Sequence, residues 1–171
     1  MAVRHEDGVE FREFASARAG QLFRIAYLLC GDWHEAQDLV QTTLAKLFVA
    51  WHRVQRTQSP DAYARRVLMN AYLSERRRKS TSEMPVAQPA LSIAASGGDD
   101  ADLRLTLVAA LTKLPPRSRA VVVLRHVDDH SIEAVAQTLG ISPAAVKSLN
   151  SRGLAQLREL LGAEMHALWS R

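Results

Sequence analysis

Four polar side chains lie close together in the last third of the chain, within a segment whose apolar residues recur at helical spacing. They are Lys147, Ser148, Ser151 and Arg152. Residues three and four apart share one face of a helix, so we expect these side chains on one exposed face. Arginine forms paired hydrogen bonds with the edge of guanine, and lysine and serine bind phosphates or base edges. The spacing therefore predicts a helix that reads duplex DNA in the major groove.

The residues around this helix form the pattern of a helix-turn-helix. Two helices that cross steeply need a small residue at their closest approach, a glycine in the turn and a branched apolar residue beyond it. All three stand at the required spacing, as Ala136, Gly140 and Val146. Ser131 and Ser142 are positioned to cap the two helices. An ordinary helical hairpin with a glycine turn is the alternative, and the agreement of caps, spacing and a basic exposed face favours the helix-turn-helix.

The rest of the chain is also helical by its apolar period. The helical segments expected before the motif span residues 11–29, 33–54, 60–79, 102–114 and 117–127. Asp32, which forms a capping box with Glu35, and Ser59 are positioned to cap the second and third of them, and Val127 should face inward in the last. The fold class is therefore all-α, with two small helical domains joined by a flexible linker, the C-terminal one containing the helix-turn-helix. The expected domains are residues 1–79 and 102–171. Residues 80–101, rich in Ser, Pro, Gly and Ala, form the linker, and we expect the domains to be tethered but independent.

The charge pattern favours a polyanionic partner. Residues 1–80 hold 13 Lys and Arg against 9 Asp and Glu, residues 81–102 hold none against 4, and residues 103–171 hold 9 against 5. Two basic blocks thus flank an acidic spacer, which should stay off DNA. No segment approaches the roughly 20 apolar residues of a membrane span, so we expect a soluble, cytoplasmic protein without membrane insertion.

Nothing in the sequence indicates catalysis, and we expect no enzyme, no metal and no other cofactor. The six histidines are scattered without the spacing of metal ligands. The run from Asp128 to His130 is better explained as a turn before a capped helix than as a metal site. Cys30 is the only cysteine, which excludes an intrachain disulfide, and we expect it in the core.

Three segments, in this order and at this spacing, resemble parts of bacterial sigma factors of the extracytoplasmic-function group, in its actinobacterial SigE-like branch. The segments are AQDLVQTTLAKLFVAWHRV, SPDAYARRVLMNAYLSERRRK and LPPRSRAVVVLRHVDDHSIEAVAQTLGISPAAVKSLNSRGLAQLR. The resemblance covers residues 9–79 and 102–162. It implies an alternative sigma factor that binds core RNA polymerase and directs promoter recognition and opening.

The resemblance also implies roles for individual residues. The −35 element would be read by Lys147, Ser148, Ser151 and Arg152. The −10 element would be bound by Gln55, Arg56, Tyr63, Arg65, Arg66, Asn70, Arg76, Arg77, Arg78 and Lys79, with the loop from Val54 to Ser59 capturing an extruded base. Core polymerase would be bound by Asp38, Gln41 and Thr42. The implied partners are the β′ clamp helices and β flap of core polymerase, promoter DNA and an anti-sigma factor.

Several alternatives stay open. A stand-alone regulator would bind a palindromic operator as a dimer, and a recombinase or nuclease would need an acidic metal cluster that the sequence does not offer. The basic run 76–79 fits phosphate binding or a solvated helix end. Trp51 and Tyr72 fall on apolar stripes and favour the core, whereas Tyr63 fits either role. Many family members have a basic residue at position 149 and an apolar one at 150, whereas this chain has Leu149 and Asn150.

Overall fold

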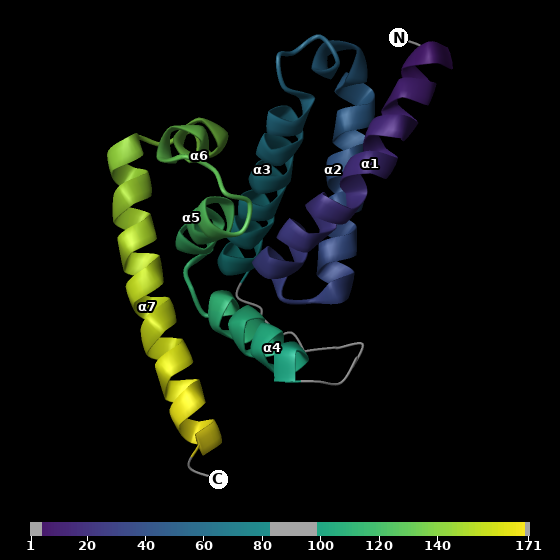
Figure 1. The fold of residues 1–171 in the computed structure, drawn as a ribbon. Coiled ribbons are helices and arrows are strands. Elements are labelled where there is room, and N and C mark those ends of the chain that lie inside the picture. The colour runs from purple at the N-terminus through teal and green to yellow at the C-terminus, as the bar shows by residue number, and fades with distance from the viewer. Residues whose placement is uncertain (1–4, 83–98, 170–171) are drawn as a thin grey trace.

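The computed structural model describes residues 5–82 and 99–169, and every regular element in these ranges is an α-helix (Figure 1). The helices are α1 (His5–Cys30), α2 (Trp33–Val54), α3 (Pro60–Thr81), α4 (Asp99–Thr112), α5 (Pro116–His126), α6 (Ile132–Leu139) and α7 (Pro143–Trp169). The all-α expectation is confirmed. Most of the expected linker, residues 83–98, lies outside the described ranges. None of the described helices is both long and apolar enough to cross a bilayer.

Short side chains fix where four of the helices begin. In each case a side-chain oxygen accepts a hydrogen bond from the backbone N–H three residues later, at 2.9–3.1 Å. The capping residues are Asp32, Ser59, Ser131 and Ser142. All four were predicted from the sequence, because capping is a local interaction.

Two glycines turn the chain where no other residue would do so without strain. Gly31 ends α1 at φ +72° and Gly140 ends α6 at φ +64°, both in the left-handed region. A Cβ on Gly140 would meet nothing within 4 Å, whereas a Cβ on Gly31 would lie 2.2 Å from Thr112 Cγ2 in α4. Gly31 is therefore also required by the close approach of α1 and α4.

Helix α5 is buried on all sides, because helices from both halves of the chain pack around it. The seven residues from Ser118 to Leu124 are all buried, and α5 contacts α1 and α3 as well as α6 and α7 (Figure 1). One hydrophobic core therefore runs through both halves. This corrects the expectation that the two domains are independent. It also corrects the inward position expected for Val127, which is 43% exposed.

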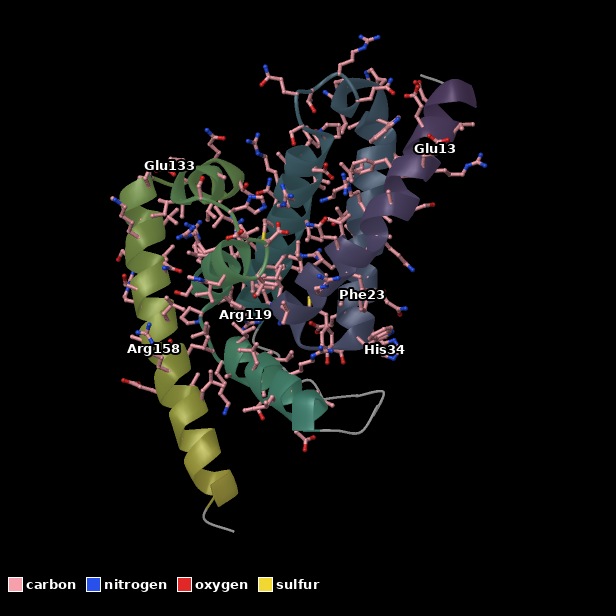
Figure 2. The ribbon with its side chains drawn as sticks, viewed as in Figure 1. Glu13, Phe23, His34, Arg119, Glu133 and Arg158 are labelled. Atoms are coloured by element: carbon pink, nitrogen blue, oxygen red, sulfur yellow. The ribbon has the colours of Figure 1, made fainter. Side chains whose placement is uncertain are left out.

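Arg119 of α5 links the two halves through backbone carbonyls. Its guanidinium donates to the carbonyl oxygen of Leu29 in α1 at 2.5 Å, to that of Leu114 at 2.9 Å and to that of Thr112. Figure 2 shows this side chain at the centre of the molecule, and it is 5% exposed. Burial lowers the pKa of Arg119 from its ordinary value. A guanidinium buried in this way depends on the carbonyl oxygens that surround it.

The core residues expected in the N-terminal half are where the sequence placed them. Cys30, Trp51 and Tyr72 are all at most 5% exposed. Trp51 packs edge-on against Phe11, with ring centroids 5.4 Å apart. Burial raises the pKa of the Cys30 thiol to about 11, so this thiol stays protonated near neutral pH.

Replacing Gly31 by alanine should destabilise the fold more than replacing Gly140 by alanine. Both variants strain a left-handed backbone, at about 1 kcal/mol each. Only at Gly31 does the new methyl group also collide with Thr112, which adds roughly 1–3 kcal/mol. Urea unfolding followed by circular dichroism measures both losses. Equal losses would mean that α1 and α4 do not approach as closely as the structure places them.

Candidate nucleic-acid interface

The first turns of α7 present the four side chains that the sequence singled out. Lys147, Ser148, Ser151 and Arg152 are all exposed on one face. The opposite face is fixed against α5: a Cβ on Gly153 would lie 2.8 Å from Val122 Cγ2. The structure thus brings the four residues together on an open surface beside the capped start of the helix.

The unusual pair at positions 149 and 150 is accommodated by α5 rather than by a rotation of α7. Leu149 is half-buried and packs against the core. Asn150 Oδ1 lies 2.9 Å from Nε2 of His126, which stands at the end of α5. Lys147, Ser148, Ser151 and Arg152 lie exposed beside this pair. Sequence reasoning missed His126 because its partner is 24 residues away.

The basic residues at the end of α3 divide into two pairs. Arg76 Nη2 lies 2.9 Å from Glu35 Oε2, and Lys79 Nζ lies 2.7 Å from Glu35 Oε1. Arg77 and Arg78 are exposed. Glu35 was expected to complete a capping box with Asp32, but its carboxylate binds α3 instead. Only Arg77 and Arg78 are therefore directly accessible to a binding partner.

The arginines in the middle of α3 contact the C-terminal half. Arg65 Nε lies 2.5 Å from Asp128 Oδ2 in the turn between α5 and α6. Arg66 Nη2 lies 3.4 Å from the carbonyl oxygen of Gln137 in α6. Asn70 remains exposed. No sequence pattern indicates these contacts, because the partners are 63 and 71 residues apart.

Asp128 is the centre of a small polar network. Its carboxylate accepts a hydrogen bond from Gln21 Nε2 at 2.8 Å and lies 2.7 Å from His130 Nε2, besides its contact with Arg65. Its side chain is only 6% exposed. Among the described residues, no group of three or more His, Cys, Asp and Glu side chains is arranged to hold a metal ion. The network is thus a contact between elements.

Helices α2 and α3 border a hollow of about 470 Å³. The hollow is lined by Ala45, Lys46, Val49, Ala50, Arg53, Tyr63 and Val67. Within the loop between α2 and α3, Arg56 is exposed and Gln55 donates to Asp7 Oδ1 at 3.1 Å. The half-buried Tyr63 therefore lies at the wall of an open, cationic hollow.

The polar face of α2 lies open to solvent. Asp38, Gln41 and Thr42 are exposed, while Leu39 and Val40 are buried on the other side of the helix. The helix therefore presents an acid, an amide and a hydroxyl on one surface. This surface is the expected contact for a large protein partner.

Comparisons with known proteins agree with this arrangement. Residues 14–81 match the family model described as sigma-70 region 2, and residues 104–157 match that described as sigma-70, region 4. The chain is 39% identical to the RNA polymerase sigma-E factor of Streptomyces avermitilis over 92% of this chain and 88% of that one. It is 33% identical to the ECF RNA polymerase sigma factor SigE of Mycolicibacterium smegmatis over 87% and 60%.

Two solved structures share the fold. The sigma factor RpoE from Bartonella quintana, solved with the anti-sigma factor NepR, has a TM-score of 0.75 at 25% identity, covering 90% of this chain and 97% of that one. CnrH, solved with the cytosolic domain of CnrY, has a TM-score of 0.63 at 25% identity, covering 90% and 88%. The chain belongs to the sigma-70 family, in its extracytoplasmic-function group and SigE-like branch, and is an alternative sigma factor rather than a stand-alone regulator.

Proposed function

We propose that this sigma factor docks on core RNA polymerase through the polar face of α2, binds the −10 element through α3 and reads the −35 element through α7. The observation that carries the proposal is the exposed set Lys147, Ser148, Ser151 and Arg152, whose opposite face is packed against α5. In this scheme residues 1–79 form the −10 domain and residues 102–171 the −35 domain. The protein acts in the cytoplasm, where the polymerase is.

The start of α7 suits entry into the major groove. Its first turns carry no acidic residue, and its free N–H groups and dipole favour the phosphates beside the groove. Arg152 can form paired hydrogen bonds with a guanine edge, while Lys147 and the two serines bind phosphates or base edges. Arg152 would then read the −35 sequence, while Lys147, Ser148 and Ser151 would position the helix on the DNA.

The loop and hollow beside Tyr63 suit an extruded base. Opening a promoter unstacks bases, at about a few kcal/mol for each flipped base. An aromatic ring and cations along the strand offset such a cost, and Tyr63, Lys46 and Arg53 line the same hollow. Asn70, Arg77 and Arg78 extend this surface along α3, all of them exposed. The proposed −10 surface therefore runs from the loop to the end of α3.

The partners follow from these surfaces. The exposed Asp38, Gln41 and Thr42 would contact the β′ clamp helices, and the −35 domain would contact the β flap. Two structurally similar sigma factors were solved with regulatory proteins, NepR and CnrY, bound to them. We therefore also propose an anti-sigma factor as a partner of this chain.

Run-off transcription from a genomic promoter pool tests the proposal. Purified core polymerase with this chain should give transcripts from a defined set of promoters, and core polymerase alone should not. The chain without polymerase should bind duplex DNA weakly. Tight binding of the free chain to a palindromic operator, without promoter-specific transcripts, would overturn the proposal.

Replacing Arg152 by alanine should weaken −35-dependent transcription by about 1–3 kcal/mol, because a guanine contact is lost. Arg158→Ala is the matched control, since Arg158 is exposed on the same helix but further from its start (Figure 2). Promoter titrations with each holoenzyme give the two values. If both variants choose and use promoters like the parent, Arg152 does not read the −35 element.

Replacing Asp38 by asparagine together with Gln41 by alanine should impair binding to core polymerase while leaving the fold intact, because both side chains are exposed and face no other helix. A control pair, Asp102→Asn with Gln137→Ala, changes the same residue types on exposed positions of the other half. Co-purification with core polymerase measures the effect. Normal recovery of the first variant would place the docking surface elsewhere.

Neutralising Arg77 and Arg78 should lower the salt dependence of holoenzyme binding to DNA. Each lost phosphate contact reduces the slope by about 0.9 for duplex or 0.7 for single strands. Neutralising Arg76 and Lys79 removes the same charge, but these residues bind Glu35, so the main effect should be a less stable fold. Identical slope changes for the two double variants would contradict this division.

A further inference from the structure

We propose that a second hollow, between α1 and α4, binds a small amphipathic anion: a phosphate, sulfonate or carboxylate group on an apolar body. This hollow encloses about 570 Å³ and is lined by Arg24, Tyr27, Leu28, Arg104, Leu107 and Val108. Ligand pockets typically measure about 300–1,000 Å³, so the space is sufficient for a small molecule. None of the lining residues belongs to the proposed DNA or polymerase surfaces, so the inference does not depend on the proposed function.

The two helices meet at one end of this hollow. A Cβ on Gly31 would lie 2.2 Å from Thr112 Cγ2 and 3.8 Å from Val108 Cγ1, so the backbone just beyond α1 touches α4 there. Figure 1 shows α1 and α4 diverging from this contact toward their N-terminal ends. The inner end of the hollow is therefore narrow, and its mouth lies between the earlier turns of the two helices.

The lining residues stand in the same order on both helices. Leu28 of α1 and Val108 of α4 lie within about one turn of the contact, whereas Arg24 and Arg104 lie about 10–12 Å from it along the helix axes. Helical side chains lean toward the N-terminus, which carries both guanidinium groups farther out. The hollow is thus apolar at its inner end and cationic at its mouth.

The two arginines at the mouth have no anion of their own. Arg24 and Arg104 are exposed, and neither has an ion-pair or hydrogen-bond partner among the described residues. By contrast, Arg18, Arg65 and Arg76 each pair with a carboxylate. Guanidinium groups bind phosphates and carboxylates through paired hydrogen bonds, so one anion at the mouth would be held from both helices.

The interior of the hollow suits an apolar body. Val108 is 3% exposed, and Leu28 and Leu107 are half-buried. The ring of Tyr27 forms part of the wall and lies at 11° to the ring of Phe23, with centroids 6.4 Å apart. Burial of apolar ligand surface supplies affinity, and the two cations orient the ligand. An amphipathic anion is the class of molecule that uses both parts of the hollow.

Fluorescence of anilinonaphthalene sulfonate, an aromatic sulfonate, tests the proposal in the free, full-length chain. We expect the parent to bind a single molecule of the probe. Arg24→Gln with Arg104→Gln should weaken binding about ten-fold or more, because charge-assisted hydrogen bonds are lost. Arg12→Gln with Arg158→Gln removes the same charge from exposed positions elsewhere on α1 and on α7, and this control should bind like the parent.

A second pair of variants tests the apolar part and leaves the arginines in place. Leu107→Trp fills the hollow and should block the probe. Leu103→Trp adds the same ring at a position of α4 that is 58% exposed, and it should bind like the parent. Circular dichroism shows whether each variant folds. In the parent, methyl resonances of Leu28 and Val108 should shift when the probe binds.

Competition distinguishes two sources of such an anion. Naphthyl phosphate represents aromatic ligands and octyl phosphate represents acyl ligands, so displacement of the probe by one or the other identifies the body that fits. Each phosphate that binds should also raise the Tm of the parent, because a ligand of the folded chain alone stabilises it. Inorganic phosphate has no apolar body and should not displace the probe.

The proposal is overturned if the parent binds neither the sulfonate nor either organic phosphate. It is also overturned if the two double-arginine variants bind the probe alike, since the cations at the mouth then play no part. If Leu107→Trp folds and binds like Leu103→Trp, the probe lies outside the hollow, with the same consequence. If Leu107→Trp does not fold, the arginine comparison and the methyl shifts decide the question.

Discussion

The burial of α5 on all sides is the constraint on which the rest of this structure depends. Seven consecutive residues from Ser118 to Leu124 are covered, which requires packed helices on every side. Arg119 adds a second requirement, because its buried charge needs hydrogen-bond acceptors. They are the carbonyl oxygens of Leu29, Thr112 and Leu114, which lie at or just beyond the ends of α1 and α4. Helix carbonyl ends carry partial negative charge and so stabilise a cation there. Two of these carbonyls belong to the same half as Arg119, and docking of the N-terminal half adds the third, that of Leu29.

The packing around α5 holds the two halves of the chain together. Separating the halves exposes the α1- and α3-facing side of α5 and returns Arg119 to water, at a cost in hydrophobic burial and hydrogen bonds. A partner can shift this equilibrium only by binding the open form more tightly than the closed form.

The sequence predicted local structure well and long-range contacts poorly, for a physical reason. Caps such as Ser59 and turns such as Gly140 act over three or four residues, so the signal and the effect lie side by side. The partner of Arg65 lies 63 residues away, and no period in the chain encodes it. Three consecutive valines, Val121 to Val123, have strand propensity but lie in the segment 117–127 that the sequence predicts as a helix, and they belong to α5. Within a helix, three consecutive valines leave little room for a polar face. Such a pattern is typical of a helix that is buried on all sides.

The exposed face of α7 shows why a set of exposed side chains could be predicted from the sequence while its support could not. Which side chains face the groove depends on how α7 is rotated, and that rotation is set behind the helix. Gly153 packs against Val122, Leu149 joins the core, and Asn150 meets His126 of α5. Two residues that depart from the usual family pattern are thus the ones that α5 holds. Because α5 also contacts α1 and α3, the helix that packs behind the exposed face of α7 is the same helix that joins the two halves of the chain.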